Sequence, residues 1–272
     1  MQTLSTHKCF GGTLGYYKHA ATSTACDMRF TAFVPPQAAT GQKQRALIFL
    51  SGLTCTEENF TAKAGAYRVA AELGLIVIAP DTSPRGEGVP AGEGGDLGFG
   101  AGFYVNATNE PWASHYRMES YIADELFNLV TAQFPIQSIG LCGHSMGGHG
   151  ALTLFLKHPG KFRSLSAFAP ICAASQSIWS KKAFTNYFGG NQESWKNHDV
   201  CELLQRQGPV NVPILVDQGM NDPFLERLQP ELLEAAAAKV GQRLVLRRHE
   251  GYDHGYFFVQ SFIEDHLRHH AG

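Results

Sequence analysis

The sequence lacks the features that mark membrane, secreted and nucleic-acid-binding chains. Its longest apolar runs, residues 46–50 and 75–80 of 272, have the length of strands and are too short to span a bilayer. The polar start at residues 1–8 has no signal-peptide pattern. The formal net charge is -2, so no basic face is available to attract nucleic acid or an anionic membrane surface. We therefore expect neither nucleic acid nor a membrane as a partner.

Cysteine spacings that build disulfide frameworks or metal sites are also missing. The six cysteines lie far apart and include no C-x-x-C pair. Without a secretory signal they are typical of free thiols in a reducing compartment, so we expect a cytoplasmic protein. The chain has no Walker A pattern, and the glycines of residues 81–102 do not fit G-x-G-x-x-G. No metal site and no nucleotide cofactor are therefore expected.

The chain does contain the material for one α/β domain. Hydrophobic residues make up 44% and charged residues 17%, which suits one substantial core. Strand-like runs alternate with segments of helical spacing, which predicts a mostly parallel central sheet with helices on both faces. We expect residues 1–272 to form this domain without linker or repeat. Strands are predicted at 29–35, 46–50, 75–80, from 138, at 164–170, 213–217 and 244–248, and helices at 60–73, 117–134, from just after 145 to 157, at 225–240 and 256–266.

Two segments lack periodicity. Residues 81–102 are rich in glycine, and long structureless loops in compact domains are usually functional rims or lids. Residues 172–199 are irregular and hold aromatic residues such as Trp179 and Trp195. We expect this second segment to be a small cap-like insertion.

The most informative stretch is Gly143-His144-Ser145-Met146-Gly147, which has the pattern G-x-S-x-G. An apolar strand precedes it and an Ala/Leu-rich helical segment follows. In that context the pattern predicts a nucleophile elbow, a sharp turn that lifts the serine hydroxyl above the sheet edge. The two glycines stand where side chains would collide with the strand or the helix. Ser145 is therefore the predicted nucleophile, in preference to a glycine-rich turn that contains a serine by chance.

A serine hydroxyl needs a base to take its proton and a carboxylate to orient the base. His254 lies directly after the last predicted strand and before the last helix, so it is the predicted base. The predicted acid is Asp222, in the loop after the strand at 213–217, with Asp217 inside that strand as the alternative. Asp253 adjoins the base and is poorly placed to reach its ring.

The remaining histidines after the serine are less well placed for a base. Two lie on or near the elbow helix, one lies in the irregular segment and one ends the last strand. We expect the final three in a solvated C-terminal tail. In chain order these histidines are His149, His158, His198, His249, His266, His269 and His270.

Backbone N–H groups should stabilise the oxyanion. One is expected from Met146, because the residue after the nucleophile opens the elbow helix. The second is expected from the loop at residues 51–56, with the N–H of Leu53 preferred and that of Thr54 as the alternative.

Longer segments are far more specific than the serine motif alone. They are LSGLTCTEENFTAKAGA, APDTSPRGEG, GAGFYVNAT, NEPW, HYRM, GHSMGGHGAL, SAFAPI, DQG, MND, PFL, GYDHGYFF and SFIEDH. In this order, from about residue 10 to residue 269, the chain closely resembles the S-formylglutathione hydrolases of the esterase D family. The resemblance implies an α/β-hydrolase fold.

The resemblance also implies an activity. The family cleaves S-formylglutathione to formate and glutathione, the last step of glutathione-dependent formaldehyde detoxification, and also hydrolyses short-chain esters. By position, its nucleophile, acid and base fall on Ser145, Asp222 and His254, and its oxyanion donors fall on Leu53 and Met146. A formyl-serine intermediate requires no metal or organic cofactor. The family further suggests a small-molecule substrate and a homo-oligomer, either a dimer or a tetramer.

One match near the site and two departures from the family pattern bear on the resemblance. Cys55 matches a family cysteine beside the site, where a packed thiol is at least as reasonable as a redox role. Pro223 follows the acid and should stiffen its loop. The family's P-W-G-x-K-A-F reads Ile178-Trp179-Ser180-Lys181-Lys182-Ala183-Phe184 here, which we expect to alter the cap and the fit of the substrate.

Other functions remain as alternatives. The first is a general short-chain carboxylesterase, for which S-formylglutathione is incidental. The second is an acyltransferase that passes the acyl group to an alcohol or sugar. The third, a binding protein without activity, is disfavoured by the intact set of triad candidates.

Overall fold

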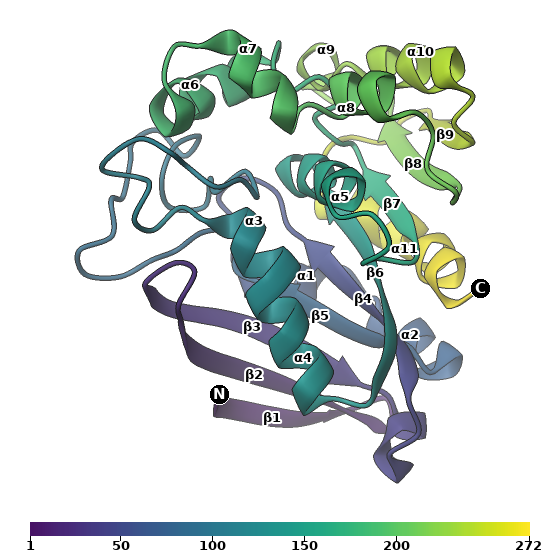
Figure 1. Ribbon diagram of the computed structural model, residues 1–272. Helices are drawn as coiled ribbons and strands as arrows, with labels where there is room; N and C mark the ends of the chain where they lie inside the picture. The colour runs from purple at the N-terminus through teal and green to yellow at the C-terminus, as the bar shows by residue number, and fades with distance from the viewer.

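One nine-stranded sheet forms the centre of the structure, a computed structural model that describes residues 1–272 (Figure 1). The strands lie in the order β1-β2-β3-β5-β4-β6-β7-β8-β9. The pairs from β1 to β5 are antiparallel, and all pairs from β5 to β9 are parallel. The strands are β1 (Gln2–Cys9), β2 (Gly12–Ala21), β3 (Cys26–Val34), β4 (Gln44–Leu50), β5 (Ile76–Pro80), β6 (Ile136–His144), β7 (Leu165–Phe168), β8 (Ile214–Gly219) and β9 (Leu244–His249).

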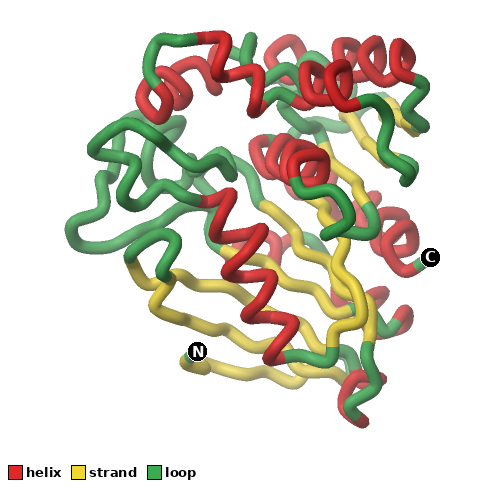
Figure 2. The backbone as a smooth tube through the Cα atoms, viewed as in Figure 1, coloured by secondary structure: helices red, strands yellow, loops and turns green.

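Helices cover both faces of this sheet (Figures 1 and 2). On one face α5 packs on β4, β6 and β7, with α4 and α8 on the same side. On the other face α11 packs on β4, β6, β7 and β8, next to α1 and α2. The predicted α/β class with a mostly parallel sheet is thus confirmed. The helices are α1 (Glu57–Lys63), α2 (Tyr67–Leu73), α3 (Met118–Ser120), α4 (Phe127–Gln133), α5 (Met146–Lys157), α6 (Ile178–Phe188), α7 (Gln192–Trp195), α8 (Val200–Gln207), α9 (Leu225–Leu228), α10 (Pro230–Val240) and α11 (Tyr256–Ala271).

The central strands are apolar without alternation because both of their faces are covered. Residues 46–50 of β4 and all of β5 are buried. In a parallel sheet the carboxyl ends of the strands lie at one edge, so the loops that leave β4, β6, β8 and β9 gather there. These are the loops that carry the predicted site residues. None of the helices is both long and apolar enough to cross a membrane.

The first two strands were not expected from the sequence. β1 is the edge strand, and its residues are almost all exposed, so it lacks an apolar pattern. It forms because its backbone pairs with β2 along nearly its whole length, from Gln2 opposite Lys18 to Cys9 opposite Gly12. Edge strands of this kind are recognised by their pairing partner more than by their own side chains.

Two predicted helices are each divided in two. The helix expected at 60–73 is interrupted between α1 and α2, where Gly65 adopts a φ of 65°. The helix expected at 225–240 is interrupted between α9 and α10, where Gln229 adopts a φ of 56° before Pro230. Proline cannot donate a hydrogen bond within a helix but suits the first helical position, so it starts a new helix here. The segment expected as a helix at 117–134 is helical from Met118 to Gln133, with a π-helical turn at Tyr121–Leu126.

The expectation that residues 172–199 are irregular is wrong. Helices α6 and α7 and a 3-10 turn occupy most of the segment, and α8 follows directly. Phe184 and Trp195 of this segment are buried and belong to the main hydrophobic core. Short helices with inward-facing aromatic residues have no clear 3.6-residue stripe, which explains why the sequence pattern missed them.

The expectation of a solvated C-terminal tail is also wrong. Helix α11 continues to Ala271, and its residues His266 and His270 are buried against the sheet. The ring nitrogen Nε2 of His266 lies 3.2 Å from Asp217 Oδ2, and the ring of His270 is hydrogen-bonded to Ser164 and Ser166. Histidines four residues apart share one helix face, so both rings point at the sheet.

A partly buried ion cluster joins α3 to the end of the elbow helix. The Glu119 carboxylate accepts a hydrogen bond from Lys157 Nζ, and its other oxygen lies 3.2 Å from His158 Nε2. Burial alone would raise the pKa of Glu119, but the hydrogen bond from His158 and the charge of Lys157 lower it to about 2. The pKa of an unfolded glutamate is about 4.3. The cluster therefore stabilises the fold fully above that pH, and this contribution is lost as the pH falls toward 2.

We expect Glu119→Gln to lower the free energy of unfolding by roughly 2 kcal/mol at pH 7 and by less at pH 3, since the lost contacts depend on the ionised carboxylate. Urea unfolding at the two pH values measures this. Glu72→Gln is a matched control, because Glu72 pairs with Arg68 while both side chains are half-exposed, and exposed pairs contribute less than about 1 kcal/mol. Equal losses for Glu119→Gln at both pH values would contradict the prediction.

Candidate active site

Ser145 occupies a strained turn between β6 and α5. Its φ of 59° and ψ of −119° are rare for a residue with a side chain, and they are typical of a nucleophile elbow. Glycine is required on both sides. A Cβ atom on Gly143 would lie 2.1 Å from the carbonyl oxygen of Gly147, and one on Gly147 would lie 1.9 Å from that of Leu50. The turn predicted from G-x-S-x-G is therefore formed.

The carboxylate of Asp222 is hydrogen-bonded to the imidazole of His254. Nδ1 of His254 lies 2.6 Å from Oδ2 of Asp222. Because a carboxylate only accepts, Nδ1 carries the proton, and Nε2 keeps a free lone pair. Two further donors hold the acid: Gln218 Nε2 at 3.1 Å and the Phe224 N–H at 2.8 Å.

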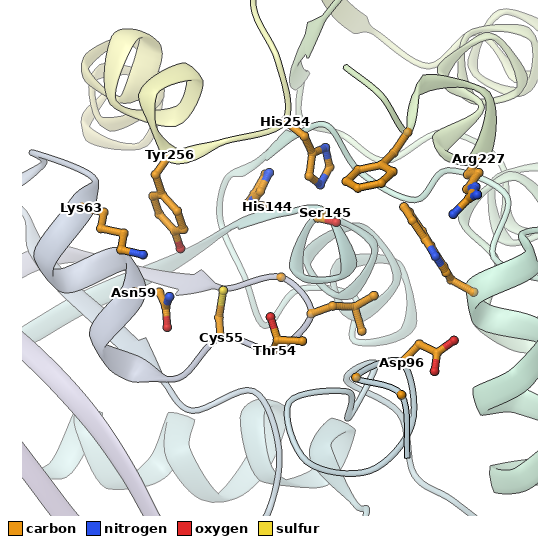
Figure 3. Close-up of a pocket in the computed structure, with 16 residues that line it drawn as sticks. Thr54, Cys55, Asn59, Lys63, Asp96, His144, Ser145, Arg227, His254 and Tyr256 are labelled. Atoms are coloured by element: carbon orange, nitrogen blue, oxygen red, sulfur yellow. The ribbon is translucent and has the colours of Figure 1, made fainter. Parts of the chain in front are cut away.

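His254 and Ser145 line the same cavity, and Figure 3 shows the imidazole and the serine hydroxyl facing each other. No hydrogen bond joins them in this structure. Such bonds are often long in a free enzyme and shorten when the substrate binds. The three predicted triad residues thus meet at the carboxyl edge of the sheet, where their catalytic roles stay a prediction.

The loop after β4 lies directly against the nucleophile. A Cβ atom on Gly52 would lie 3.1 Å from Ser145 Cβ, so the loop touches the turn. The N–H groups of Leu53 and Met146 donate to no acceptor within the protein. The N–H of Thr54, the alternative donor, is occupied by the carbonyl oxygen of Gly100 at 2.9 Å. The structure therefore favours Leu53 over Thr54 as the second oxyanion donor.

Side chains from the glycine-rich segment 81–102 fix this loop. The carbonyl oxygen of Cys55 accepts hydrogen bonds from Thr82 Oγ1 at 2.5 Å and from Arg85 Nη2 at 3.1 Å. Arg85 is itself paired with the buried carboxylate of Asp81. The segment predicted as a rim thus holds the oxyanion loop in place through hydrogen bonds to the carbonyl of Cys55.

The cavity over the triad has a volume of about 540 Å³. Trp179 and Phe224 line it, and their rings lie 4.9 Å apart with an edge-to-face angle of 72°. Phe224 also packs edge-on against the ring of His254 at 5.1 Å. Trp179 of the expected cap therefore contacts the site, whereas its neighbour Ser180 is fully buried and lies outside the cavity.

His144 lines the same cavity and was not predicted as a site residue. Its ring lies 4.6 Å from that of His254, and neither of its ring nitrogens has a side-chain or backbone partner. Burial and the neighbouring His254 lower the pKa of His144 well below its ordinary value, so it stays neutral. Its position inside the G-x-S-x-G motif was the only sequence signal.

Cys55 lies beside Tyr256 at the edge of the cavity and is partly buried. Burial raises the pKa of its thiol, so the reactive thiolate is disfavoured at neutral pH. A packed thiol therefore fits the environment of Cys55 better than a redox role.

The other histidines are engaged elsewhere. His149 is buried between Phe103 and Phe184, and burial lowers its pKa to about 4. The ring of His198 stacks on Phe188 at 4.3 Å. Neither lines the cavity.

Asp217, the alternative acid, belongs to a separate buried cluster. Its carboxylate accepts two hydrogen bonds of 2.6 Å from Arg247 and lies 3.2 Å from rings of His249 and His266. Burial opposes the charge, yet the hydrogen bonds from His266 and Arg247 lower the pKa of Asp217 below its ordinary value. The residue faces α11, and Asp222 alone reaches the base.

Taken together, the arrangement suits acyl transfer through a serine ester. It contains a nucleophile in a strained turn, a base oriented by a buried acid, and two unoccupied backbone donors beside the nucleophile.

Known proteins resemble this chain in sequence and in fold over nearly its whole length. The model of the Esterase family matches residues 21–269. The chain is 48% identical to the S-formylglutathione hydrolase of Mus musculus, with 100% of this chain and 98% of the mouse protein covered, and the values for that of Rattus norvegicus are the same. A solved structure of an S-formylglutathione hydrolase from Agrobacterium tumefaciens superposes with a TM-score of 0.96 at 43% identity, covering 100% of this chain and 99% of the other.

The substitutions Asp222→Asn and Asp217→Asn distinguish the predicted catalytic carboxylate from the structural one. Asp222→Asn should lower kcat for an activated ester by about 10³- to 10⁴-fold with little loss of stability, because the imidazole loses its orienting acceptor. Asp217→Asn should instead lower the free energy of unfolding by about 3 kcal/mol, because it weakens a buried ion pair. Kinetics and urea unfolding on both variants measure this, and a larger kcat loss for Asp217→Asn would contradict the assignment.

Proposed function

The chain belongs to the Esterase family, as its resemblance to the S-formylglutathione hydrolases predicted, and on that basis we propose that it hydrolyses S-formylglutathione to formate and glutathione. The observation that carries this proposal is the full-length match to S-formylglutathione hydrolases in a chain whose Ser145 and His254 line one cavity, with Asp222 hydrogen-bonded to His254. The substrate is a small molecule, and the enzyme is a serine hydrolase.

The first half of the reaction forms an acyl-enzyme. Ser145 Oγ attacks the thioester carbonyl while Nε2 of His254 takes its proton, and Asp222 stabilises the imidazolium that results. The N–H groups of Leu53 and Met146 donate hydrogen bonds to the negatively charged carbonyl oxygen. Each of these donors contributes about 3 kcal/mol of transition-state stabilisation. As the tetrahedral intermediate collapses, the imidazolium of His254 gives its proton to the departing sulfur. Glutathione leaves as a thiol, His254 is neutral again, and a formyl-serine ester remains.

The second half repeats these steps with water as the nucleophile. His254 removes a proton from water, which attacks the formyl ester, and the oxyanion forms again at the same two N–H groups. Return of the proton to Ser145 Oγ releases formate. Because the oxyanion donors are backbone groups, their side chains contribute little, and Leu53→Ala is not an informative variant.

Three further expectations belong to this proposal. Residues 1–272 act as one α/β-hydrolase domain in which the insertion around 172–199 covers the site through Trp179. The six free cysteines support a reducing compartment such as the cytoplasm, where glutathione-dependent formaldehyde detoxification takes place. The family resemblance supports a homodimer or homotetramer.

The proposed substrate is tested by comparing kcat/KM for S-formylglutathione with kcat/KM for 4-nitrophenyl acetate. We expect S-formylglutathione to be preferred by roughly 100-fold or more, because specificity is the ratio of these values. Equal values, or a preference for the ester, would indicate a general short-chain carboxylesterase. Products formed in the presence of an added alcohol decide the acyltransferase alternative, for which an ester would replace formate.

Fluorophosphonate labelling tests the nucleophile directly. The wild-type protein should be labelled at Ser145, and Ser145→Ala should show neither labelling nor turnover, since no other side chain of the cavity is activated by the base. Labelling that persists in Ser145→Ala would refute the assigned nucleophile.

A further inference from the structure

Two cations of the active-site cavity have no anionic partner within the protein. Lys63, at the end of α1, and Arg227, in α9, both line the cavity. Neither takes part in the ion pairs that many other lysines and arginines of this chain form. An unpaired surface cation is ordinary by itself, because water solvates it well.

Aromatic side chains of the cavity lie beneath both cations. Lys63 Nζ is 5.9 Å from the ring centre of Tyr256, and Arg227 Cζ is 5.1 Å from that of Trp179. Both rings also line the cavity. An aromatic face attracts a cation without neutralising its charge. The two charges are thus held at the cavity and remain available to an anionic ligand.

The two cations stand on opposite walls with the nucleophile between them. Figure 3 shows Lys63 to one side and Arg227 to the other, with Ser145 and His254 in the middle. The sheet explains this placement. Helix α1 follows β4 and helix α9 follows β8, whereas the nucleophile follows β6, which lies between those strands. A ligand whose carbonyl sits at the nucleophile reaches both cations only by extending in two directions.

The Lys63 wall offers two donors to one carboxylate. Asn59 lies four residues earlier on α1, on the same helix face, and also lines the cavity. Its side-chain oxygen accepts a hydrogen bond of 2.9 Å from the Thr56 N–H, which leaves its NH₂ group free to donate. An ammonium and an amide NH₂ side by side form a suitable site for a carboxylate.

The Arg227 wall also carries a negative charge. Asp96 is the only carboxylate that lines the cavity, and it lies on the same side as Arg227 in Figure 3. It pairs with Lys182 at 2.5 Å, and the lysine side chain is 41% exposed. Exposed pairs are weak, so the carboxylate can accept a second cation. A guanidinium and a carboxylate on the same wall complement a group that bears both a carboxylate and an ammonium.

Glutathione has the charges that match these two walls. Its sulfur lies between two arms: the glycine arm ends in a carboxylate, and the γ-glutamyl arm ends in a carboxylate and an ammonium. We propose that Lys63 and Asn59 bind the glycine carboxylate and that Arg227 and Asp96 bind the γ-glutamyl end, an inference that rests on the proposed function. Anchors remote from the reacting carbonyl let the enzyme distinguish glutathione thioesters from neutral esters.

A variant and a modified substrate test the Lys63 contact together. The substrates are S-formylglutathione and its derivative with the glycine carboxylate as an ethyl ester. Lys63→Met should lower kcat/KM about tenfold for the parent and less than about twofold for the derivative, because the charge it binds is already absent. Lys63→Arg should retain most of the parent activity. Equal losses for Lys63→Met on the two substrates would overturn the assignment.

The other wall and the control follow the same design. Arg227→Met should lower kcat/KM by a similar factor on both substrates, since the ethyl ester leaves the γ-glutamyl end unchanged. Asp96→Asn should lower kcat/KM for the parent but not for a derivative whose γ-glutamyl amine is acetylated. Lys43→Met is the matched control, because Lys43 is exposed before the amino end of β4, opposite the cavity, and it should affect no substrate. An effect of Arg227→Met confined to the parent would reverse the assignment of the arms and overturn it.

Inhibition by S-methylglutathione separates failure of this inference from failure of the proposed function. The inhibitor constant is measured with 4-nitrophenyl acetate as the reporter substrate, so the assay needs no thioester cleavage. We expect the inhibitor constant to rise about tenfold in Lys63→Met. An unchanged constant in an enzyme that prefers S-formylglutathione refutes the anchors alone. A raised constant in an enzyme without that preference supports the anchors and refutes the proposed function.

Discussion

A serine backbone held at a positive φ is the constraint on which this structure depends. A residue with a side chain loses about 1–3 kcal/mol in such a conformation, so the surroundings must enforce it. Here β6 enters the turn from the middle of the sheet and α5 leaves it with nearly every residue buried. Gly143 lies close to Gly147, and Gly147 lies close to Leu50, so neither glycine position has room for a side chain. The hydroxyl of Ser145 is thereby placed before any substrate arrives.

The acid and the base depend on a second constraint, the buried carboxylate of Asp217. It contacts Arg247 and His249 of β9 and His266 of α11, while it belongs itself to β8. Asp222 lies in the loop after β8, and His254 lies in the loop between β9 and α11. One ionised side chain therefore fixes the three elements whose loops bring the acid to the base. The residue is structural, although by sequence it competed for the catalytic role.

The long segment between β5 and α3 has no regular structure because its polar groups serve other elements. Thr82 and Arg85 hold the carbonyl of Cys55, and the carbonyl of Gly100 holds the N–H of Thr54. These hydrogen bonds fix the oxyanion loop without using the N–H of Leu53. The same segment brings Asp96 to the cavity wall. A helix or strand would have used the carbonyl of Gly100 within itself.

The sequence by itself determined the features that depend on local backbone chemistry or on chain order. The elbow followed from two glycines around Ser145, and the positions of His254 and Asp222 followed from the order of strands and loops. Tertiary structure alone decided the rest: the pairing of the polar edge strand β1, the helices within 172–199, and the burial of His266 and His270 in a segment that reads as a tail. The same holds for Lys63 and Arg227, which are unremarkable in sequence and far apart along the chain. The role of such side chains depends on partners in distant segments. No local pattern encodes which segments the sheet brings together.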